Sequence, residues 1–254
     1  MQKLKPMEAG GILARLFLRT PVLTRRSLLL VLLLGIDIAV GFALAQAASR
    51  SDDPPNVFSL LAGEVLFGFL LPFAALQFGT AVIRDEVETG TLGYLLMRPI
   101  SRRTLIASRL AAATAATVLV GLATCELNAA LFGVSDATWH LGTIAAVVLG
   151  GAAYTALFAA VGVVFNRPFL VGILYLLLYE LTVSHLPMSA RAATIRFHLE
   201  NMAGVAPRNE LLDFLAGDIG VSTSVGVVLG VLVAMVALSL WAFGRREYTT
   251  DTNV

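Results

Sequence analysis

The sequence contains little charge and a single cysteine. Only 14% of its 254 residues are Asp, Glu, Lys or Arg, whereas 57% are hydrophobic, and the mean hydropathy is +0.83. A water-soluble domain of this length carries more charge than this. The scarcity of charge therefore excludes an ordinary soluble domain and indicates a chain embedded in lipid. The lone Cys125 excludes an intrachain disulfide, and we expect it to be a small core residue.

Motifs that bind nucleotides or perform hydrolysis are also missing. The sequence has no G-x-x-x-x-G-K-[ST] loop and no Gly-Lys pair, so the chain cannot bind ATP through a Walker loop. It has no H-E-x-x-H and no G-x-S-x-G pattern, and the histidines, His140, His185 and His198, form no recognisable ligand set. We therefore expect no catalytic residue, no metal site and no enzyme activity in this chain.

What the sequence does contain is a series of six long apolar windows. A hydrocarbon core of about 30 Å requires roughly 20 helical residues. The windows are apolar all round and rich in Leu, Ala, Val and Gly, which favours helices over barrel strands. The sequence thus predicts an all-α polytopic membrane protein, a single transmembrane domain over residues 1–254, with spans at about 27–46, 57–83, 105–131, 141–165, 169–186 and 221–243.

Lysine and arginine are distributed unevenly between the two sides of these spans. Most of them precede the first span, lie in the loop 84–103, or follow the fourth and sixth spans. Cationic flanks stay on the cytoplasmic side of a membrane. We therefore expect a multi-pass protein of the cell membrane with both termini in the cytoplasm and with residues 187–220 outside. The external side holds only Arg50, Arg191, Arg196 and Arg208.

Two segments outside the spans have amphipathic patterns. Residues 7–20 place apolar side chains on one face with arginines near its edge, which predicts an interfacial helix on the cytoplasmic surface. In the external segment 187–220, Ile195, Leu199 and Met202 follow an i, i+4, i+7 spacing beside charged residues. This second pattern predicts a helix on the external surface.

The loop between the second and third windows, residues 84–103, has a clear local pattern. Gly90 loosens the chain after an acidic turn, Thr91 can cap a new helix, and Pro99 ends it. An exposed apolar face on this short helix requires a partner, either a protein or the lipid head groups. That face is formed by Leu92, Leu95 and Leu96.

The same loop resembles the cytoplasmic signature of the ABC-two-type (type V) exporter permeases. The resemblance rests on a glutamate, a Gly-Thr-Leu step, a leucine pair and a Pro-Ile-Ser-Arg run, here Glu86, 90–92, 95–96 and 99–102. It implies a permease subunit that forms the translocation path and receives a separate ATPase subunit, with the signature segment as the coupling helix. The docking residues it implies are Asp85, Glu86, Glu88, Gly90, Thr91, Leu92, Leu95, Leu96, Pro99 and Arg102.

Further partners follow from this resemblance. It implies a second permease copy, as a homodimer or a heterodimer, the lipid bilayer, and no nucleic acid. ATP and Mg would be bound by the ATPase subunit and not by this chain. Two alternatives stay open on the sequence alone, namely a secondary transporter and a non-transporting membrane anchor for a cytoplasmic protein.

Acidic residues occur inside the predicted spans, where each central carboxylate costs about 3 kcal/mol of insertion free energy. Two interpretations are open. The carboxylates line the substrate path, which we favour for Asp37 and Glu180, or they are neutral groups that hold helices together through hydrogen bonds, which we favour for Glu64 and Glu126. We expect no Lys or Arg partner for them within the membrane. The residues are Asp37, Glu64, Glu126 and Glu180.

Overall fold

The computed structural model describes residues 25–48, 58, 61–88, 90, 97, 101–134, 136–183, 188–205 and 219–245. All regular structure within these ranges is helical, which confirms the all-α class. The predicted interfacial helix 7–20 lies outside the described residues. The helices are α2 (Arg25–Ala48), the π-helix η2 (Ala62–Leu70), α4 (Leu71–Glu88), α6 (Arg102–Phe132), α7 (Ala137–Val164), α8 (Pro168–Leu174), the π-helix η3 (Tyr175–Leu181), α9 (Met188–Arg191), α10 (Ile195–Ala203) and α12 (Val221–Arg245).

Five of the described helical segments are long and apolar enough to cross a membrane. They are Leu30–Ala47, Ala62–Val87, Arg102–Phe132, Ala137–Val164 and Val221–Arg245. The predicted fifth window, 169–186, contains the shorter apolar helix Pro168–Leu181, formed by α8 and η3. The six-span count therefore stays a prediction.

Local signals in the sequence set the ends of two long helices. Ser101 caps α6, because its side chain accepts a hydrogen bond from the backbone N–H of Thr104 at 3.1 Å. Gly133 ends α6 in the left-handed conformation, at φ 66°. Asp136 then caps α7 by accepting from the N–H of Thr138 at 3.0 Å. The turn between α6 and α7 is consequently short, and the two helices run antiparallel.

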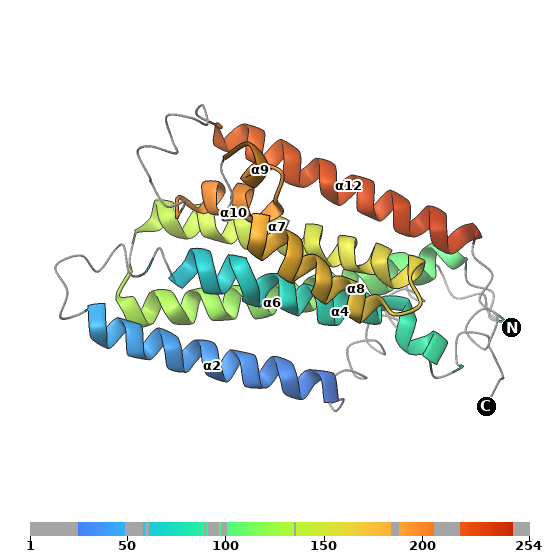
Figure 1. The fold of residues 1–254 in the computed structure, drawn as a ribbon, viewed down its shortest axis with the longest axis horizontal. Helices are drawn as coiled ribbons and strands as arrows, with labels where there is room; N and C mark the ends of the chain where they lie inside the picture. The colour runs from blue at the N-terminus through green and yellow to red at the C-terminus, as the bar shows by residue number, and fades with distance from the viewer. Residues whose placement is uncertain are drawn as a thin grey trace, which may run out of the picture.

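Helix α7 lies at the centre of the bundle and packs against α4, α6, α10 and α12 (Figure 1). Its inward side chains include Tyr154 and Phe158, which are fully buried. Close packing against α4 depends on Gly79, where a Cβ atom would lie 2.8 Å from the carbonyl oxygen of Thr155. Small residues of this kind allow membrane helices to approach closely.

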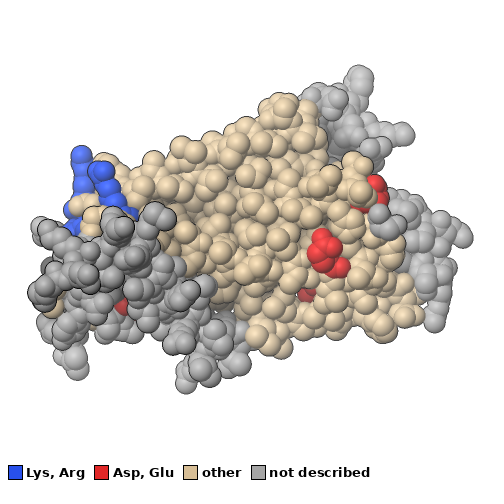
Figure 2. All heavy atoms as spheres, turned by 180° about the vertical axis from the view of Figure 1, so that it is seen from behind, with Lys and Arg blue, Asp and Glu red and all other residues tan. Residues whose placement is uncertain are grey.

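The two ends of the bundle differ in the sign of their exposed charged side chains. On the face that Figure 2 shows, the visible Lys and Arg lie at one end, and the visible Asp and Glu lie mainly in the opposite half. We call this the basic end. It contains the carboxyl ends of α4 and α12, the amino end of α6 and the turn between α7 and α8 (Figure 1). Its described arginines include the buried Arg109 together with Arg84, Arg102, Arg103, Arg167 and Arg245.

Candidate functional site

A buried ion pair joins α4 to α6 at the basic end. Arg109 donates to the Glu86 carboxylate at 2.5 Å and to the backbone carbonyl of Val82 at 3.2 Å. The Arg109 side chain is 5% exposed and that of Glu86 is 21% exposed, so solvent screens the pair little. The two helices also share an apolar cluster that includes Val82, Ile83 and Ile106. We call the ion pair the Glu86–Arg109 clamp.

The clamp lies at the base of the predicted coupling segment. Glu86 is two residues from the end of α4, and Gly90 follows in the left-handed conformation, at φ 69°, with its N–H donating to the Val87 carbonyl at 3.2 Å. A side chain at position 90 would be strained in this conformation, which explains why glycine occupies this position. At the other end of the segment, Ser101 begins α6. The segment between positions 90 and 101 therefore follows the end of α4 and precedes the start of α6, and the clamp joins these two helices.

The predicted docking residues are described only in part. Asp85 and Glu86 are half-buried at the end of α4, and Arg102 is exposed at the start of α6. Glu88 is the last residue of α4. The remaining docking residues of that prediction, apart from Gly90, lie outside the described ranges: Thr91, Leu92, Leu95, Leu96 and Pro99.

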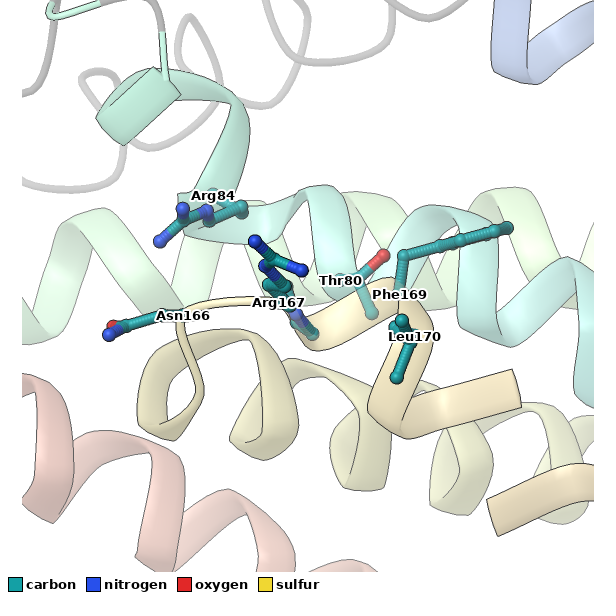
Figure 3. Close-up of a pocket in the computed structure, with 7 residues that line it drawn as sticks. Thr80, Arg84, Asn166, Arg167, Phe169 and Leu170 are labelled. Atoms are coloured by element: carbon teal, nitrogen blue, oxygen red, sulfur yellow. The ribbon is translucent and has the colours of Figure 1, made fainter. Parts of the chain in front are cut away.

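A hollow of about 310 Å³, lined by apolar and basic side chains, lies between α4 and the turn that leads into α8 (Figure 3). Arg84 and Arg167 enter it from these two elements, and Asn166 lies at its edge. None of the described residues that line it carries a carboxylate. The lining residues are Thr80, Arg84, Asn166, Arg167, Pro168, Phe169 and Leu170.

At the opposite end of the bundle, α10 corrects the prediction of an external surface helix. Both its apolar and its charged side chains are buried, because it inserts between α7, α12 and η2. Ile195 and Leu199 belong to the main apolar cluster. Thr194 caps the helix by accepting from the Phe197 N–H at 3.3 Å, and Gly204 ends it at φ 67°. The amphipathic pattern is real, but its charged face contacts protein.

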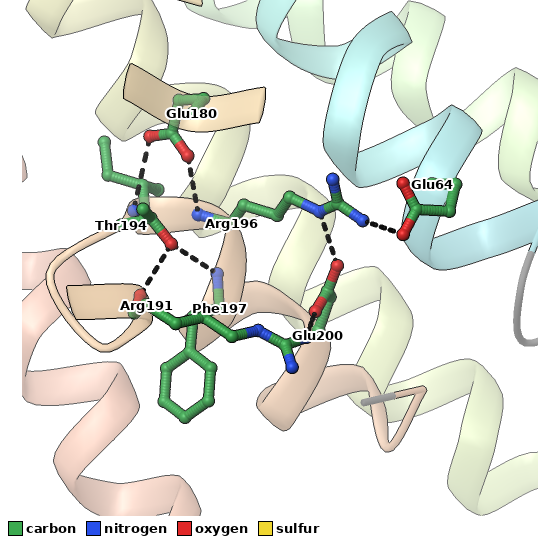
Figure 4. A network of polar contacts seen from close by, with 8 residues as sticks. Glu64, Glu180, Arg191, Thr194, Arg196, Phe197 and Glu200 are labelled. Atoms are coloured by element: carbon green, nitrogen blue, oxygen red, sulfur yellow. Dashed lines mark hydrogen bonds and ion pairs between the residues drawn. The ribbon is translucent and has the colours of Figure 1, made fainter. Parts of the chain in front are cut away.

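The charged face of α10 forms a network of ion pairs (Figure 4). Arg196 binds Glu64 of η2 and Glu200 of its own helix, each at 2.6 Å. The second oxygen of Glu200 accepts from Arg191 at 2.6 Å. The expectation that Glu64 lacks a cationic partner was therefore wrong, because the sequence placed Arg196 outside the bundle. We call these residues the α10 network.

Glu180 of η3 joins the same network through the backbone. Its carboxylate accepts from the N–H groups of Ile195 and Arg196 at 3.3 and 3.4 Å, and from the Tyr175 hydroxyl at 2.9 Å. These two N–H groups belong to the first turn of α10, where backbone donors have no partner within the helix. Glu180 therefore fixes the amino end of α10 (Figure 4).

The four acidic residues predicted in the spans thus lie in three places. Glu64 and Glu180 meet at the α10 network, with Glu64 42% exposed and Glu180 fully buried. Asp37 of α2 is buried and accepts from the Asn128 side chain of α6 at 2.9 Å. Glu126 is exposed, 3.5 Å from His140.

His198 ties α10 to α12. Its Nε2 lies 2.9 Å from the Ala192 carbonyl, which only accepts, so Nε2 carries the proton. Nδ1 of the neutral ring then accepts from the Ser224 hydroxyl at 3.1 Å. Burial lowers the pKa of His198, because the charged imidazolium loses its hydration.

Sequence reasoning missed Arg109, Arg196, Glu200 and His198 as site residues. Two signals were available. Thr194 and Gly204 are strong start and stop residues for a nine-residue helix, and Arg196 and Glu200 have the i, i+4 spacing of an ion pair. Neither signal indicates that the helix is buried.

Five apolar helices of bilayer length and an arginine-rich end define a multi-pass membrane protein. The chain matches the family described as ABC-2 family transporter protein over residues 14–248. It therefore belongs to the ABC-2 transporter family, as a transmembrane permease of an ABC transporter, which confirms the resemblance found in the loop 84–103. No curated protein matches the sequence.

Proposed function

We propose that this chain is the permease subunit of an ATP-driven exporter and that residues 84–103 receive a separate ATPase subunit. ATP and Mg are bound by that partner, and two permeases pair around the translocation path. Family membership supports a transport role for this chain. The observation that supports docking at this segment in particular is the Glu86–Arg109 clamp.

The clamp suits a segment that transmits force. A partner that pushes on residues 91–100 loads the end of α4 and the beginning of α6, between which Arg109 forms an ion pair and a backbone hydrogen bond. Because the apolar cluster beneath includes Phe243 of α12 and Val163 of α7, these helices share the load. A displacement at the segment is then passed on to a packed group of helices instead of being absorbed by a loose loop.

The proposed topology has six spans and places the basic end in the cytoplasm. The arginines of the basic end support this orientation by the positive-inside rule. The helix Pro168–Leu181 then belongs to the fifth span of this topology. With this orientation, both termini and the coupling segment face the ATPase, and the α10 network lies toward the outer surface.

Of the four acidic residues predicted to line the substrate path, those with exposed side chains are best placed to contact cargo. The Glu64 and Glu126 side chains are 42% and 51% exposed, whereas Asp37 and Glu180 are buried and hydrogen-bonded within the subunit. We therefore propose Glu64 and Glu126 as candidates for the path and assign Asp37 and Glu180 to helix packing. Asp37→Asn with export and expression unchanged is the expected result, and lost export with normal expression would contradict this assignment.

The docking proposal is tested by purifying the tagged chain from its native membrane in mild detergent and identifying the proteins that accompany it. We expect a Walker-motif ATPase with the wild type and its loss from the Leu95→Asp, Leu96→Asp double variant. Met97→Asp is the matched control, because Met97 is 75% exposed and lies outside the predicted apolar face. Folded wild-type protein that brings no ATPase would contradict the proposal and favour a secondary transporter. An ATPase whose rate the permease does not change would favour an anchor.

A further inference from the structure

Helix α2 is buried against the bundle at one polar pair. It lies at an edge of the bundle (Figure 1), and among its residues 30–47 only Asp37 and Gly41 are buried. Both contact Asn128 of α6. The Asn128 side-chain N–H donates to Oδ2 of Asp37 at 2.9 Å, and a Cβ atom at position 41 would overlap Oδ1 of Asn128. The contact between α2 and α6 is therefore centred on the Asp37–Asn128 pair.

This pair lacks a hydrogen-bond donor. Oδ1 of Asp37 and Oδ1 of Asn128 are buried, and neither has a hydrogen-bond partner in the described part of the chain. Both atoms only accept when the carboxyl group is ionised, so they cannot bond to each other. None of the ion pairs between described residues includes Asp37. A carboxylate that is buried in a membrane span without a counter-charge is costly.

One proton on Asp37 supplies the missing donor. A protonated carboxyl group has an O–H that an amide oxygen accepts. The terminal torsions of Asp and Asn have broad preferences, so the two groups can align with one hydrogen bond in each direction. We propose that Asp37 binds a proton, donates this O–H to Oδ1 of Asn128, and thereby attaches α2 to α6. Loss of the proton leaves two unpaired acceptors, which weakens the attachment. This proton extends the helix-packing role of Asp37, and the attachment requires no ATPase.

A water molecule or a metal ion fits the pair less well than a proton. The small cavity lined by Asn128 and Cys125 has a volume of about 10 Å³, at the lower limit for one water molecule. Asp37 is not among the described residues that line this cavity, so a water molecule there does not serve both oxygens. A hard cation takes about six oxygen ligands, whereas the pair offers two.

Other titratable groups on the neighbouring elements α6, α4 and η2 have partners of their own or lie away from the pair. Glu64 of η2 binds Arg196, and Glu126 of α6 lies 3.5 Å from His140. Cys125 of α6 is buried, and the distance measurement below removes it. The remaining titratable residues lie near the basic end of α4 and α6 or at the start of α2, namely Arg84, Asp85, Glu86, Glu88, Arg102, Arg103, Arg109, Arg25 and Arg26.

Infrared spectroscopy of the full-length protein in phosphatidylcholine vesicles tests the protonation, with ¹³C in the side-chain carboxyl groups of aspartate. A protonated carboxyl group has a C=O stretching band that a carboxylate lacks. At neutral pH we expect this band in the wild type and its loss in Asp37→Asn. Identical spectra would overturn the proposal. A wild-type band that appears only after choline replaces sodium in the buffer would assign the site to a metal cation and would also overturn it.

Two glycines of α2 test the partner of the proton. Gly41→Ala should shift the band, because the added Cβ displaces Oδ1 of Asn128. Gly35→Ala is the matched control on the same helix and should leave the band unchanged, because open space surrounds that position. Asn128→Leu removes the acceptor and should also shift the band, and it decides if Gly41→Ala does not fold. A band at the wild-type position in the folded Gly41→Ala and Asn128→Leu proteins would overturn the pairing.

A distance measurement tests the attachment of α2. Spin labels are placed at Val40→Cys on α2 and Leu127→Cys on α6 in a Cys125→Ala background, since these two side chains are 38% and 41% exposed. As the pH is raised, we expect the carboxyl band to disappear and the distance between the labels to increase over the same pH interval. Asp37→Asn keeps an uncharged amide beside Asn128, so its distance should stay constant. An equal increase in Asp37→Asn, or a wild-type distance that stays constant while the band disappears, would overturn the proton-dependent attachment.

Discussion

Replacing Glu200 by glutamine is expected to destabilise the folded chain far more than the same replacement at Glu64, although both carboxylates bind the guanidinium of Arg196. Glu200 is 1% exposed and pairs with both Arg191 and Arg196, whereas Glu64 is 42% exposed and pairs with Arg196. The chemical change is the same at both positions. The comparison therefore measures the combined contribution of burial and of the ion pair with Arg191.

The magnitudes follow from what each variant leaves behind. Without the Glu200 charge, Arg191 and Arg196 lose their shared buried anion, and breaking such a pair costs about 3–5 kcal/mol. The amide oxygen still accepts one hydrogen bond, worth about 1 kcal/mol, so we expect a net loss of about 3 kcal/mol. At Glu64 solvent screens the charge, and the expected loss is about 0.5 kcal/mol.

The assay is the free energy of unfolding in mixed micelles, with sodium dodecyl sulfate as denaturant and far-UV circular dichroism as the signal. A difference of about 2–3 kcal/mol between Glu200→Gln and Glu64→Gln is expected from these two values. Losses that agree within about 0.5 kcal/mol, or a larger loss at Glu64, would refute the assignment of the α10 network as a buried structural element.

Three further predictions use the same assay. Glu86→Gln should cost about 2 kcal/mol, because Arg109 is buried and loses the negative charge of its ion pair with Glu86; a loss no larger than that of the exposed Glu126→Gln would contradict the clamp. Gly68→Ala should cost about 1–3 kcal/mol, because its Cβ would lie 2.8 Å from Nη1 of Arg196, whose guanidinium is held by Glu64 and Glu200, whereas Gly226→Ala, with open space around it, should not destabilise; equal effects would argue against close packing at Gly68. Because burial lowers the pKa of His198, the unfolded chain binds this proton more readily, so its contribution to stability is complete above about pH 6.5 and is lost as the pH falls below that value. His198→Gln should flatten this dependence, and an unchanged slope would contradict it.

Much of the fold was predictable because the bilayer imposes simple rules. Segments such as Ala137–Val164 are apolar over a length that only a spanning helix explains, and Ser101 and Asp136 mark the starts of helices α6 and α7. The family signature around Glu86 was also readable, because it depends on the order of residues within one loop.

The α10 network was not predictable, because Arg196 of α10 pairs with a carboxylate from a distant part of the sequence. Arg196 finds Glu64 more than a hundred positions away in the chain, and no local spacing reports such a partner. Without that pairing, a charged face on a short helix indicates the surface. The π-helix η2, which ends just before Pro72, was likewise not predictable from the sequence. There, the Leu71 N–H bonds to the Leu66 carbonyl, a widening that sequence periodicity does not encode.

The central claim is that residues 91–100 touch an ATPase subunit, and cross-linking from a single cysteine measures this most directly. Cys125 is the only native cysteine and is buried, so Cys125→Ala provides the background. Leu95→Cys is labelled with a photoactivatable maleimide in native membranes, with Leu141→Cys, on an exposed position at the opposite end of the bundle, as control. We predict an adduct between position 95 and a Walker-motif ATPase, and none from position 141. Efficient labelling at position 95 without an ATPase adduct would contradict the account.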